Sequence, residues 1–261
     1  MRTYFKVPAF SKRAWKVWLR NRDVFMKTYK VNFILPFLEP LLYLFALGFG
    51  LGRYIEVIEG MTYARFIAPA LIAVAIMNSA FFECTYGSYV RMYYQKTFDA
   101  IIATPLSIED VITGELLWGA TRSLIHATIM LPVLAAFGLI ELPSSLLIIP
   151  LSFLAGFLFA CIGMCFTAIT PNINSLSYPT YLFITPMFLF SGTFFPLTLL
   201  PKPIQYAALA TLPLTHVVGI TRALTLAAPS GFLLVSFAWI LIVSLILFVL
   251  AVNLMKNRLI V

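Results

Sequence analysis

Two long stretches of the sequence contain no charged side chain. The first runs for 60 residues from Leu142 to Pro201, and the second for 33 residues from Ala223 to Met255. Of the 261 residues, 61% are hydrophobic and 11% are Asp, Glu, Lys or Arg, whereas soluble domains carry about 25% charged residues. Such stretches suit the hydrocarbon core of a bilayer and cannot form a surface in contact with water. The sequence therefore excludes a soluble enzyme, a nucleic-acid-binding protein and a disordered chain.

The apolar segments predict an all-α membrane protein with six transmembrane helices. A helix needs about 20 apolar residues to cross the bilayer core, and a barrel is excluded because its strands alternate over roughly ten residues. The expected spans lie near Val31–Gly52, Phe66–Tyr86, Leu116–Ile140, Leu146–Ile169, Ser175–Leu200 and Phe232–Leu254. Residues 31–261 therefore form one membrane domain.

Basic residues predict the orientation of this domain. Nine of the 18 Lys and Arg residues lie in residues 1–30. If that segment lies inside the cell, the predicted inner segments carry thirteen basic residues and the predicted outer segments carry four. Since basic residues collect on the cytoplasmic side, both termini are expected there. An apolar pattern recurs at helical spacing, apart from the basic residues, so residues 1–30 predict a basic amphipathic helix in the headgroup layer. Its members are Phe10, Ala14, Val17, Trp18, Phe25 and Tyr29. A solvated helix that serves only as an orientation signal is the alternative.

Groups that could catalyse a reaction are scarce. The sequence has no Gly-rich phosphate loop ending in Gly-Lys-Ser/Thr, and His126 and His216 have no carboxylate at metal-ligand spacing. We therefore expect no catalytic residue, metal site or cofactor in this chain. Ionisable groups within membrane spans are functional candidates by default. The candidates of this kind are Glu39, Glu83, Arg122 and His126. The cysteines that we expect to act as small packing residues are Cys84, Cys161 and Cys165.

The hydrophilic stretch between the second and third spans, residues 91–115, predicts a helical elbow. A short helix over Lys96–Thr104 is stopped by Pro105, and Ser107 begins a second helix with acidic residues in its first turn. An exposed apolar side of the first helix suits docking into the groove of a partner protein. The residues on that side are Phe98, Ile101 and Ile102. An elbow that lies on the membrane surface is the alternative.

Proline and glycine interrupt the sequence after the fifth predicted span. The stretch from Phe190 to Pro196 contains both, and more prolines follow up to Pro213. Residues 203–222 are largely apolar but short for a full crossing. A re-entrant helical hairpin over about 197–222, entering from the outer leaflet, satisfies both facts, because irregular backbone at membrane depth must be buried in protein. An ordinary outer loop is the alternative.

In this order on six spans, these regions resemble the transmembrane subunit of type-2 ABC exporters, the ABC-2 permeases. The resemblance is greatest to the nodulation-protein-J branch, which exports lipo-chitooligosaccharides, and extends to lipid, polysaccharide and drug exporters. It covers nearly the whole chain and depends on the joint order and spacing of several stretches, none of them catalytic. These stretches are Leu38–Tyr43, Gly48–Gly52, Thr97–Leu106, Ser191–Pro196 and Pro213–Arg222.

The resemblance implies a homodimer in the bacterial cytoplasmic (inner) membrane, powered by two separate ATP-binding cassette subunits that hold ATP and magnesium. It also implies that each elbow is a coupling helix in a groove of an ATP-binding subunit, and that the re-entrant hairpin shapes the outer exit. The coupling residues expected on this basis are Lys96, Thr97, Phe98, Asp99, Ile101, Ile102, Thr104 and Pro105. The pathway or gate residues expected on this basis are Tyr43, Phe45, Phe49, Phe188, Phe190, Thr193, Phe194, Phe195 and Pro196.

The aromatic, nearly uncharged character of these pathway residues favours an amphiphilic cargo over a long hydrophilic polymer. A lipid-linked oligosaccharide, a glycolipid or a lipid has that character. For each aromatic residue, contact with membrane lipid or packing inside the bundle is the alternative. Two classes of function therefore stay open. One is the permease subunit of an ATP-driven exporter for such a cargo, a drug or a polysaccharide, and the other is a stand-alone ion-coupled carrier that depends on Glu39 or His126.

Overall fold

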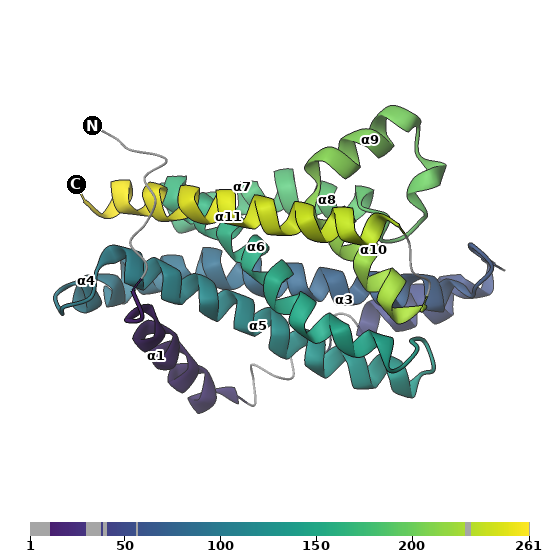
Figure 1. Ribbon diagram of the computed structural model, residues 1–261, viewed down its shortest axis with the longest axis horizontal. Coiled ribbons are helices and arrows are strands. Elements are labelled where there is room, and N and C mark those ends of the chain that lie inside the picture. Colours follow the sequence, from purple (N-terminus) through teal and green to yellow (C-terminus); the bar gives the residue numbers. More distant parts are fainter. Residues whose placement is uncertain (1–10, 30–37, 39–40, 56, 228–230, 261) are drawn as a thin grey trace.

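The computed structural model describes residues 11–29, 38, 41–55, 57–227 and 231–260. In this part of the chain most long helices lie along one axis (Figure 1), and extended residues pair only in a single bridge, Ile58 with Met61. The all-α prediction is therefore confirmed for the described residues. The α-helices are α1 Ala14–Lys27, α3 Tyr63–Phe82, α4 Thr97–Ile102, α5 Ile108–Ala136, α6 Ile148–Ile169, α7 Ser177–Pro179, α8 Thr185–Phe190, α9 Lys202–Thr211, α10 Pro213–Thr225 and α11 Phe232–Leu259. The 3₁₀ or π-helical turns are η1 Leu44–Gly50, η2 Leu51–Arg53, η3 Glu83–Gly87, η4 Val90–Tyr94, η5 Ser144–Leu147, η6 Ile173–Leu176, η7 Thr180–Ile184 and η8 Leu197–Leu199.

Four of the described helices are long and apolar enough to cross a membrane, and they correspond to the second, third, fourth and sixth predicted spans. They are Tyr63–Tyr94, Ile108–Ala136, Ser144–Ile169 and Phe232–Leu259. The bent pair of α9 and α10 makes a fifth if it counts as one crossing. In the first predicted span, Leu41–Arg53 is a shorter apolar helix, while residues 31–37 and Glu39 lie outside the described residues. The count of six spans stays a prediction.

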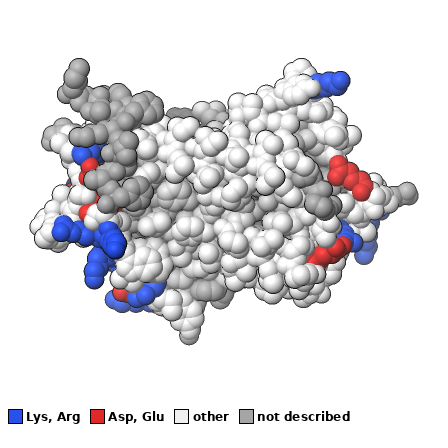
Figure 2. Space-filling model, viewed as in Figure 1, with Lys and Arg blue, Asp and Glu red and all other residues white. Residues whose placement is uncertain are grey.

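On the face drawn in Figure 2, charged side chains lie at the two ends of the bundle, with a broad uncharged band between them. One end, here called the elbow end, holds α4 and the C-terminal turn of α11, with α1 beside it (Figure 1). The opposite end, the far end, holds the ion pair between Arg65 and Glu141. An uncharged band of this kind is what a bilayer core requires of the protein surface. Which end faces the cytoplasm stays a prediction.

Two span boundaries differ from the sequence prediction. We expected the fifth span to continue to Leu200, but α8 ends at Phe190, because the chain turns at Gly192, which has a left-handed φ of +75°. We expected the third span to begin at Leu116, but α5 begins at Ile108, because Ser107 provides an N-terminal cap there. The second helix of the predicted elbow and the third span are therefore one continuous helix.

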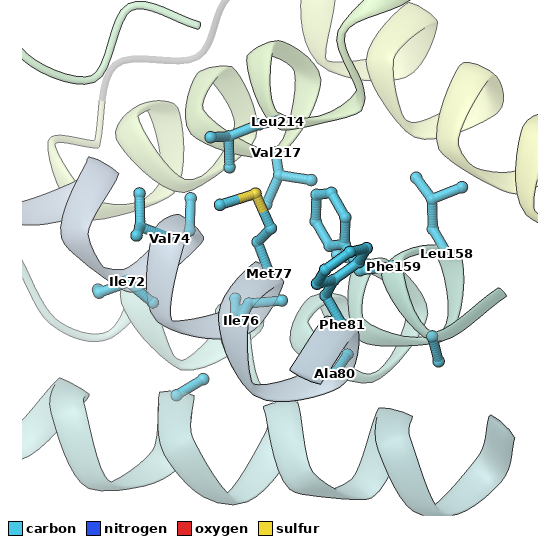
Figure 3. Close-up of a cluster of buried hydrophobic side chains, with 14 of the residues drawn as sticks. Ile72, Val74, Ile76, Met77, Ala80, Phe81, Leu158, Phe159, Leu214 and Val217 are labelled. Carbon is cyan, nitrogen blue, oxygen red and sulfur yellow. The ribbon is translucent and has the colours of Figure 1, made fainter. Parts of the chain in front are cut away.

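α3 lies at the centre of the bundle, and α11 lies at its surface. Met77 and Phe81 of α3 are fully buried; Figure 3 shows Met77 near Val217 of α10, and Phe81 beside Phe159 of α6. α11 exposes a row of large apolar side chains, of which Leu234 is 82% exposed. Lipid is as apolar as these side chains, so a membrane protein tolerates such exposure and derives its stability from close packing.

α9 and α10 meet at an angle of 92°, with the break between Thr211 and Pro213. Proline has no backbone N–H to continue the preceding helix and is favoured in the first turn of the next one. At its C-terminal end α10 returns to the far end, where the carbonyl oxygen of Thr225 accepts a 2.7 Å hydrogen bond from the N–H of Glu141. This shape fits the predicted re-entrant hairpin, which stays a prediction because a broken crossing has the same bend.

Glycines let α3, α5 and α6 approach closely. A Cβ atom at Gly156 of α6 would lie 2.5 Å from Cβ of Ser123 in α5, and one at Gly163 would lie 2.8 Å from the carbonyl oxygen of Phe81 in α3. Small residues at such crossings are the usual means by which membrane helices pack. Cys84 belongs to the same contact, since its Sγ would lie 2.7 Å from a Cβ at Gly119. All three cysteines are free, and Cys84 and Cys161 are buried, which confirms their predicted role as packing residues.

We predict that Gly156→Ala lowers the apparent melting temperature of the purified protein. The added methyl group overlaps Ser123, and overpacking of this kind costs about 1–3 kcal/mol. The matched control is Gly219→Ala in α10, where an added Cβ meets no atom within 4 Å. Thermal unfolding of both variants in one detergent checks the prediction. Equal melting temperatures would show that the α5–α6 crossing is looser than described here.

Candidate coupling elbow and translocation face

The elbow is a sharp excursion between η4 and α5. Lys96 has a left-handed φ of +53°, which ends the preceding helix and sends the chain into α4. Long side chains rarely adopt this conformation, so the turn is a fixed feature of the backbone. At the other side of the elbow, Ser107 and Asp110 form a capping box: Oγ of Ser107 accepts from the Asp110 N–H at 3.2 Å, and Asp110 accepts from the Ser107 N–H at 3.0 Å. The sequence predicted this cap.

The apolar side of α4 points into the protein, so the expected exposed docking face is wrong. Phe98 is fully buried, and Ile101 and Ile102 are half-buried against the same core. The physical reason is that a six-residue helix keeps its place by burying one large side chain in the bundle that supports it. The elbow instead exposes small or polar residues. Those exposed are Lys96, Asp99, Ala100, Ala103, Thr104 and Pro105, while Thr97 is half-buried.

Hydrogen bonds and an ion pair tie the elbow region to the first and the last of the described α-helices. Arg13, which directly precedes α1, donates to the Pro105 carbonyl oxygen at 2.7 Å, and Arg20 of α1 donates to Oγ1 of Thr97 at 3.4 Å. Lys256 near the end of α11 pairs with Glu109 in the first turn of α5. A displacement of the elbow is therefore opposed by α1 and by α11.

A buried ion cluster, the Arg91 cluster, lies directly behind the elbow and consists of Glu83, Arg91, Glu115 and Arg122. The Arg91 guanidinium lies 2.8 Å from a carboxylate oxygen of Glu83 and 2.6 Å from one of Glu115. Glu115 is 1% exposed and also accepts hydrogen bonds from Ser88 at 2.7 Å and, in α1, from Asn21 at 2.6 Å. Buried charges are stable only when paired and hydrogen-bonded in this way. The cluster therefore joins α1, α3 with its π-helical extensions, and α5.

The cluster is what sequence reasoning missed. Glu83 and Arg122 were candidates as ionisable groups near spans, but nothing in the spacing paired them with Arg91 or Glu115, which lie in the predicted elbow. His126 is also buried, and its Nε2 has no hydrogen-bond partner among the described residues. Glu39, the other residue of the ion-coupled alternative, lies outside the described residues. The described residues contain no group of three or more His, Cys, Asp and Glu that could hold a metal ion.

α1 packs on the bundle through one face and exposes another. Val17 and Phe25 are buried against α5, where a Cβ at Gly114 would lie 2.5 Å from that of Val17, and Trp18 donates to Thr121 at 2.8 Å. Burial lowers the pKa of Arg20 from its ordinary value, while the Glu115 carboxylate opposes that effect. The exposed apolar side chains of the segment are Trp15, Val24, Met26 and Tyr29. This helix carries the part of residues 1–30 that the structure describes, and its place in the headgroup layer stays a prediction.

The expected pathway residues fall into two groups. In the first, Tyr43 and Phe188 have ring centroids 6.0 Å apart, and Phe188 lies 4.7 Å from Phe194. This chain of rings joins the Leu41–Arg53 helix to α8 and to the turn after it. Tyr43 and Phe188 also line a cavity of about 180 Å³ together with Met77 and Asn78 of α3.

The second group lies apart from that cavity. Phe45 and Phe49 pack around Phe137 at the end of α5, with centroids 5.8 and 5.9 Å from it, and both remain substantially exposed. Phe190 is exposed, Phe195 is half-buried, and Thr193 and Pro196 are buried within the turn after α8. A single continuous aromatic face is therefore not present within one described chain.

Arg222 of α10 fixes the turn that follows α8. Its guanidinium donates to the Gly192 carbonyl oxygen at 2.9 Å and lies 4.0 Å from the ring centroid of Phe66 in α3. The candidate gate residues are thus held by a cation from the proposed hairpin.

Comparison with known proteins assigns this arrangement to a family. The family model described as ABC-2 type transporter matches residues 9–226, which include α1, the elbow and α10. The chain belongs to the ABC-2 type transporter family. It is 34% identical to nodulation protein J of Sinorhizobium fredii over 93% of this chain and 92% of that protein, and 34% identical to nodulation protein J of Rhizobium meliloti over 82% and 81%. The inner membrane transport permease YadH of Escherichia coli is 22% identical over 71% of this chain and 72% of that protein.

The family membership confirms the resemblance drawn from the sequence. The matched residues, 9–226, include the elbow and the four residues of the Arg91 cluster. In this ABC-2 transporter chain the buried ion pairs therefore lie beside the segment that we expect to meet a partner.

We predict that Glu115→Ala destabilises this ABC-2 transporter chain and releases α1. The change leaves Arg91 with one carboxylate and removes the acceptor of Asn21, and breaking a buried pair costs about 3–5 kcal/mol. Thermal unfolding and the rate of trypsin cleavage within α1 measure the two effects. Glu141→Ala, which removes an exposed ion pair with Arg65, is the control and is expected to change stability by less than about 1 kcal/mol. Similar stability of the two variants would contradict the prediction.

Proposed function

We propose that this chain is the transmembrane permease subunit of an ATP-driven exporter. Two copies form the pathway across the bacterial cytoplasmic (inner) membrane, with both termini in the cytoplasm, and two separate ATP-binding cassette subunits supply the energy. The observation that carries the proposal is the family match over residues 9–226. The chain itself acts as a membrane subunit without catalytic residues, and ATP and magnesium bind to the partner subunits.

The elbow is the proposed site of coupling to those subunits. It projects from the elbow end between η4 and α5, and Phe98 fixes it to the bundle from inside. Its exposed side chains include the small ones of Ala100, Ala103 and Thr104, where a partner can approach the backbone closely. A force applied there by closing ATP-binding subunits acts directly on η4 and α5, which the Arg91 cluster joins.

The proposed cargo is an amphiphile, such as a lipid-linked oligosaccharide, a glycolipid or a lipid. Support comes from the aromatic cavity beside Tyr43 and Phe188 and from the likeness to nodulation protein J over more than nine-tenths of both chains. In a homodimer, the exposed Phe45, Phe49 and Phe190 complete the pathway at the interface between the copies. A drug or a polysaccharide is the alternative cargo, and transport assays with each class in vesicles separate them.

We predict that Ala100→Trp prevents association with the ATP-binding subunits while the permease still folds. Ala100 is exposed on α4, so a bulky side chain blocks a close-fitting partner without filling the protein's own core. Purification from the native membrane in mild detergent, followed by mass spectrometry, measures the co-purified ATPase, which is expected to fall by about tenfold, equivalent to about 1.4 kcal/mol. Vesicle transport that requires ATP is expected to fall with it.

Ala210→Trp is the matched control, because Ala210 is exposed on α9, distant along the chain from the elbow. It is expected to retain the ATPase partner. A wild-type chain that purifies without any ATPase and moves solute in vesicles without ATP would overturn the proposal and return attention to Glu39 and His126.

We predict that the α9–α10 pair enters and leaves the membrane on the outer side. Single cysteines at Lys202 and Ala227, both exposed and placed before and after the pair, are expected to react with an impermeant thiol reagent added outside. The native cysteines are replaced for this experiment. Labelling of the two positions from opposite faces would show a full crossing instead of a re-entrant hairpin.

A further inference from the structure

A cavity of about 410 Å³ lies between α1 and the elbow end of α3 and α5. Its walls include Arg20 and Phe25 of α1, Arg91 of η4, and Trp118 and Arg122 of α5. The cavity is separate from the aromatic cavity at Tyr43, with which it shares no lining residue. The coupling function of the elbow does not use it.

The described groups around this cavity leave one positive charge without a counterion. Three guanidinium groups, those of Arg20, Arg91 and Arg122, face two carboxylates, those of Glu83 and Glu115. Both carboxylates bind Arg91 at 2.8 Å or less. Arg20 donates only to the neutral oxygens of Asn21 at 3.0 Å and Thr97 at 3.4 Å.

Arg122 is a guanidinium with spare hydrogen-bonding capacity in the cavity wall. Its Nε is buried without a hydrogen-bond partner among the described residues, and its nearest carboxylate oxygen, in Glu83, is 3.8 Å away. The guanidinium carbon of Arg122 lies 5.0 Å from the ring centroid of Phe25, and this contact holds the guanidinium group in place. Since the Nε atom has no accessible surface, a ligand in the cavity would meet the outer nitrogens of the Arg122 guanidinium.

The rest of the wall combines the polar side chains of Asn21, Thr28 and Gln95 with a larger apolar part. Val24 and Phe25 of α1 face Tyr86, Val90 and Trp118 across the cavity. The elbow end also marks the limit of the uncharged band in Figure 2, which is the level of lipid phosphates in a bilayer. The site therefore offers guanidinium donors to an anion and an apolar wall to the chain that carries it.

We propose that this cavity binds the phosphate headgroup of a phospholipid with one net negative charge, held by Arg20 and Arg122. Guanidinium groups match phosphate oxygens through paired charge-assisted hydrogen bonds, and a single negative charge balances the single unpaired cation. The bound lipid joins α1 to α5 beside the Arg91 cluster. This proposal does not depend on the export function.

The test adds dioleoylphosphatidylglycerol to the delipidated full-length chain in detergent and measures bound lipid by native mass spectrometry and the melting temperature. We expect one tightly bound lipid and a higher melting temperature for the wild type. Arg20→Gln and Arg122→Gln are each expected to weaken the affinity by about tenfold, as for the loss of one charge-assisted hydrogen bond. Arg22→Gln, which removes an exposed arginine paired with Asp23 on the same helix, is the control and is expected to bind like the wild type.

Two further probes separate the sources of binding. Dioleoylglycerol, which lacks the phosphate, and inorganic phosphate, which lacks the chains, are each expected to stabilise the protein little. Equal stabilisation by dioleoylglycerol would overturn the headgroup assignment, and equal stabilisation by inorganic phosphate would show an anion site without a lipid. Should Arg122→Gln fail to fold, Arg20→Gln decides alone, since Arg20 is half-buried and forms no ion pair within the described residues. Wild-type affinity in Arg20→Gln would overturn the proposal.

Discussion

A guanidinium buried at the edge of a hydrocarbon layer needs carboxylates at fixed positions, and Arg91 has two of them. Because Glu83 precedes the elbow and Glu115 follows it, this one side chain sets the distance between the two helices from which the elbow projects. Glu115 extends the constraint to α1 through Asn21. The Arg91 cluster thus fixes the positions of the elbow, α1 and α5 relative to one another.

The elbow's own composition follows from that support. Its large apolar residue, Phe98, serves the bundle, and small or polar residues remain for a partner. Large aromatic side chains are exposed directly before the turn, at Tyr93 and Tyr94 of η4. The buried Phe98 and the left-handed turn at Lys96 fix the elbow to the bundle.

Much of the fold was predictable because lipid imposes simple rules on sequence. Long apolar segments predicted the spans that became α3, α5, α6 and α11, and Ser107 predicted the start of a helix. The sequence could not reveal that Phe98 turns inward, because an amphipathic helix of six residues has the same pattern whether its apolar side meets its own bundle or another protein. Nor could it pair Arg91 with Glu115, since that contact depends on how two long helices are aligned. The turn at Gly192 was recognised as irregular, but the point at which the fifth span stops depends on tertiary contacts such as that of Arg222.

The surface helix α11 packs one face along α6, where the rings of Phe157 and Phe248 have centroids 5.7 Å apart, and polar contacts hold both of its ends. Near its start, Ser236 lies 3.1 Å from the Nδ1 atom of His216 in α10, and near its end Lys256 pairs with Glu109 while Arg258 donates to the Thr170 carbonyl oxygen at 2.6 Å. A helix of 28 residues is about 42 Å long, and the face of α11 turned away from α6 exposes large apolar side chains such as Leu234. α11 therefore links the first turn of α5, beside the elbow, to α10 along the length of the bundle.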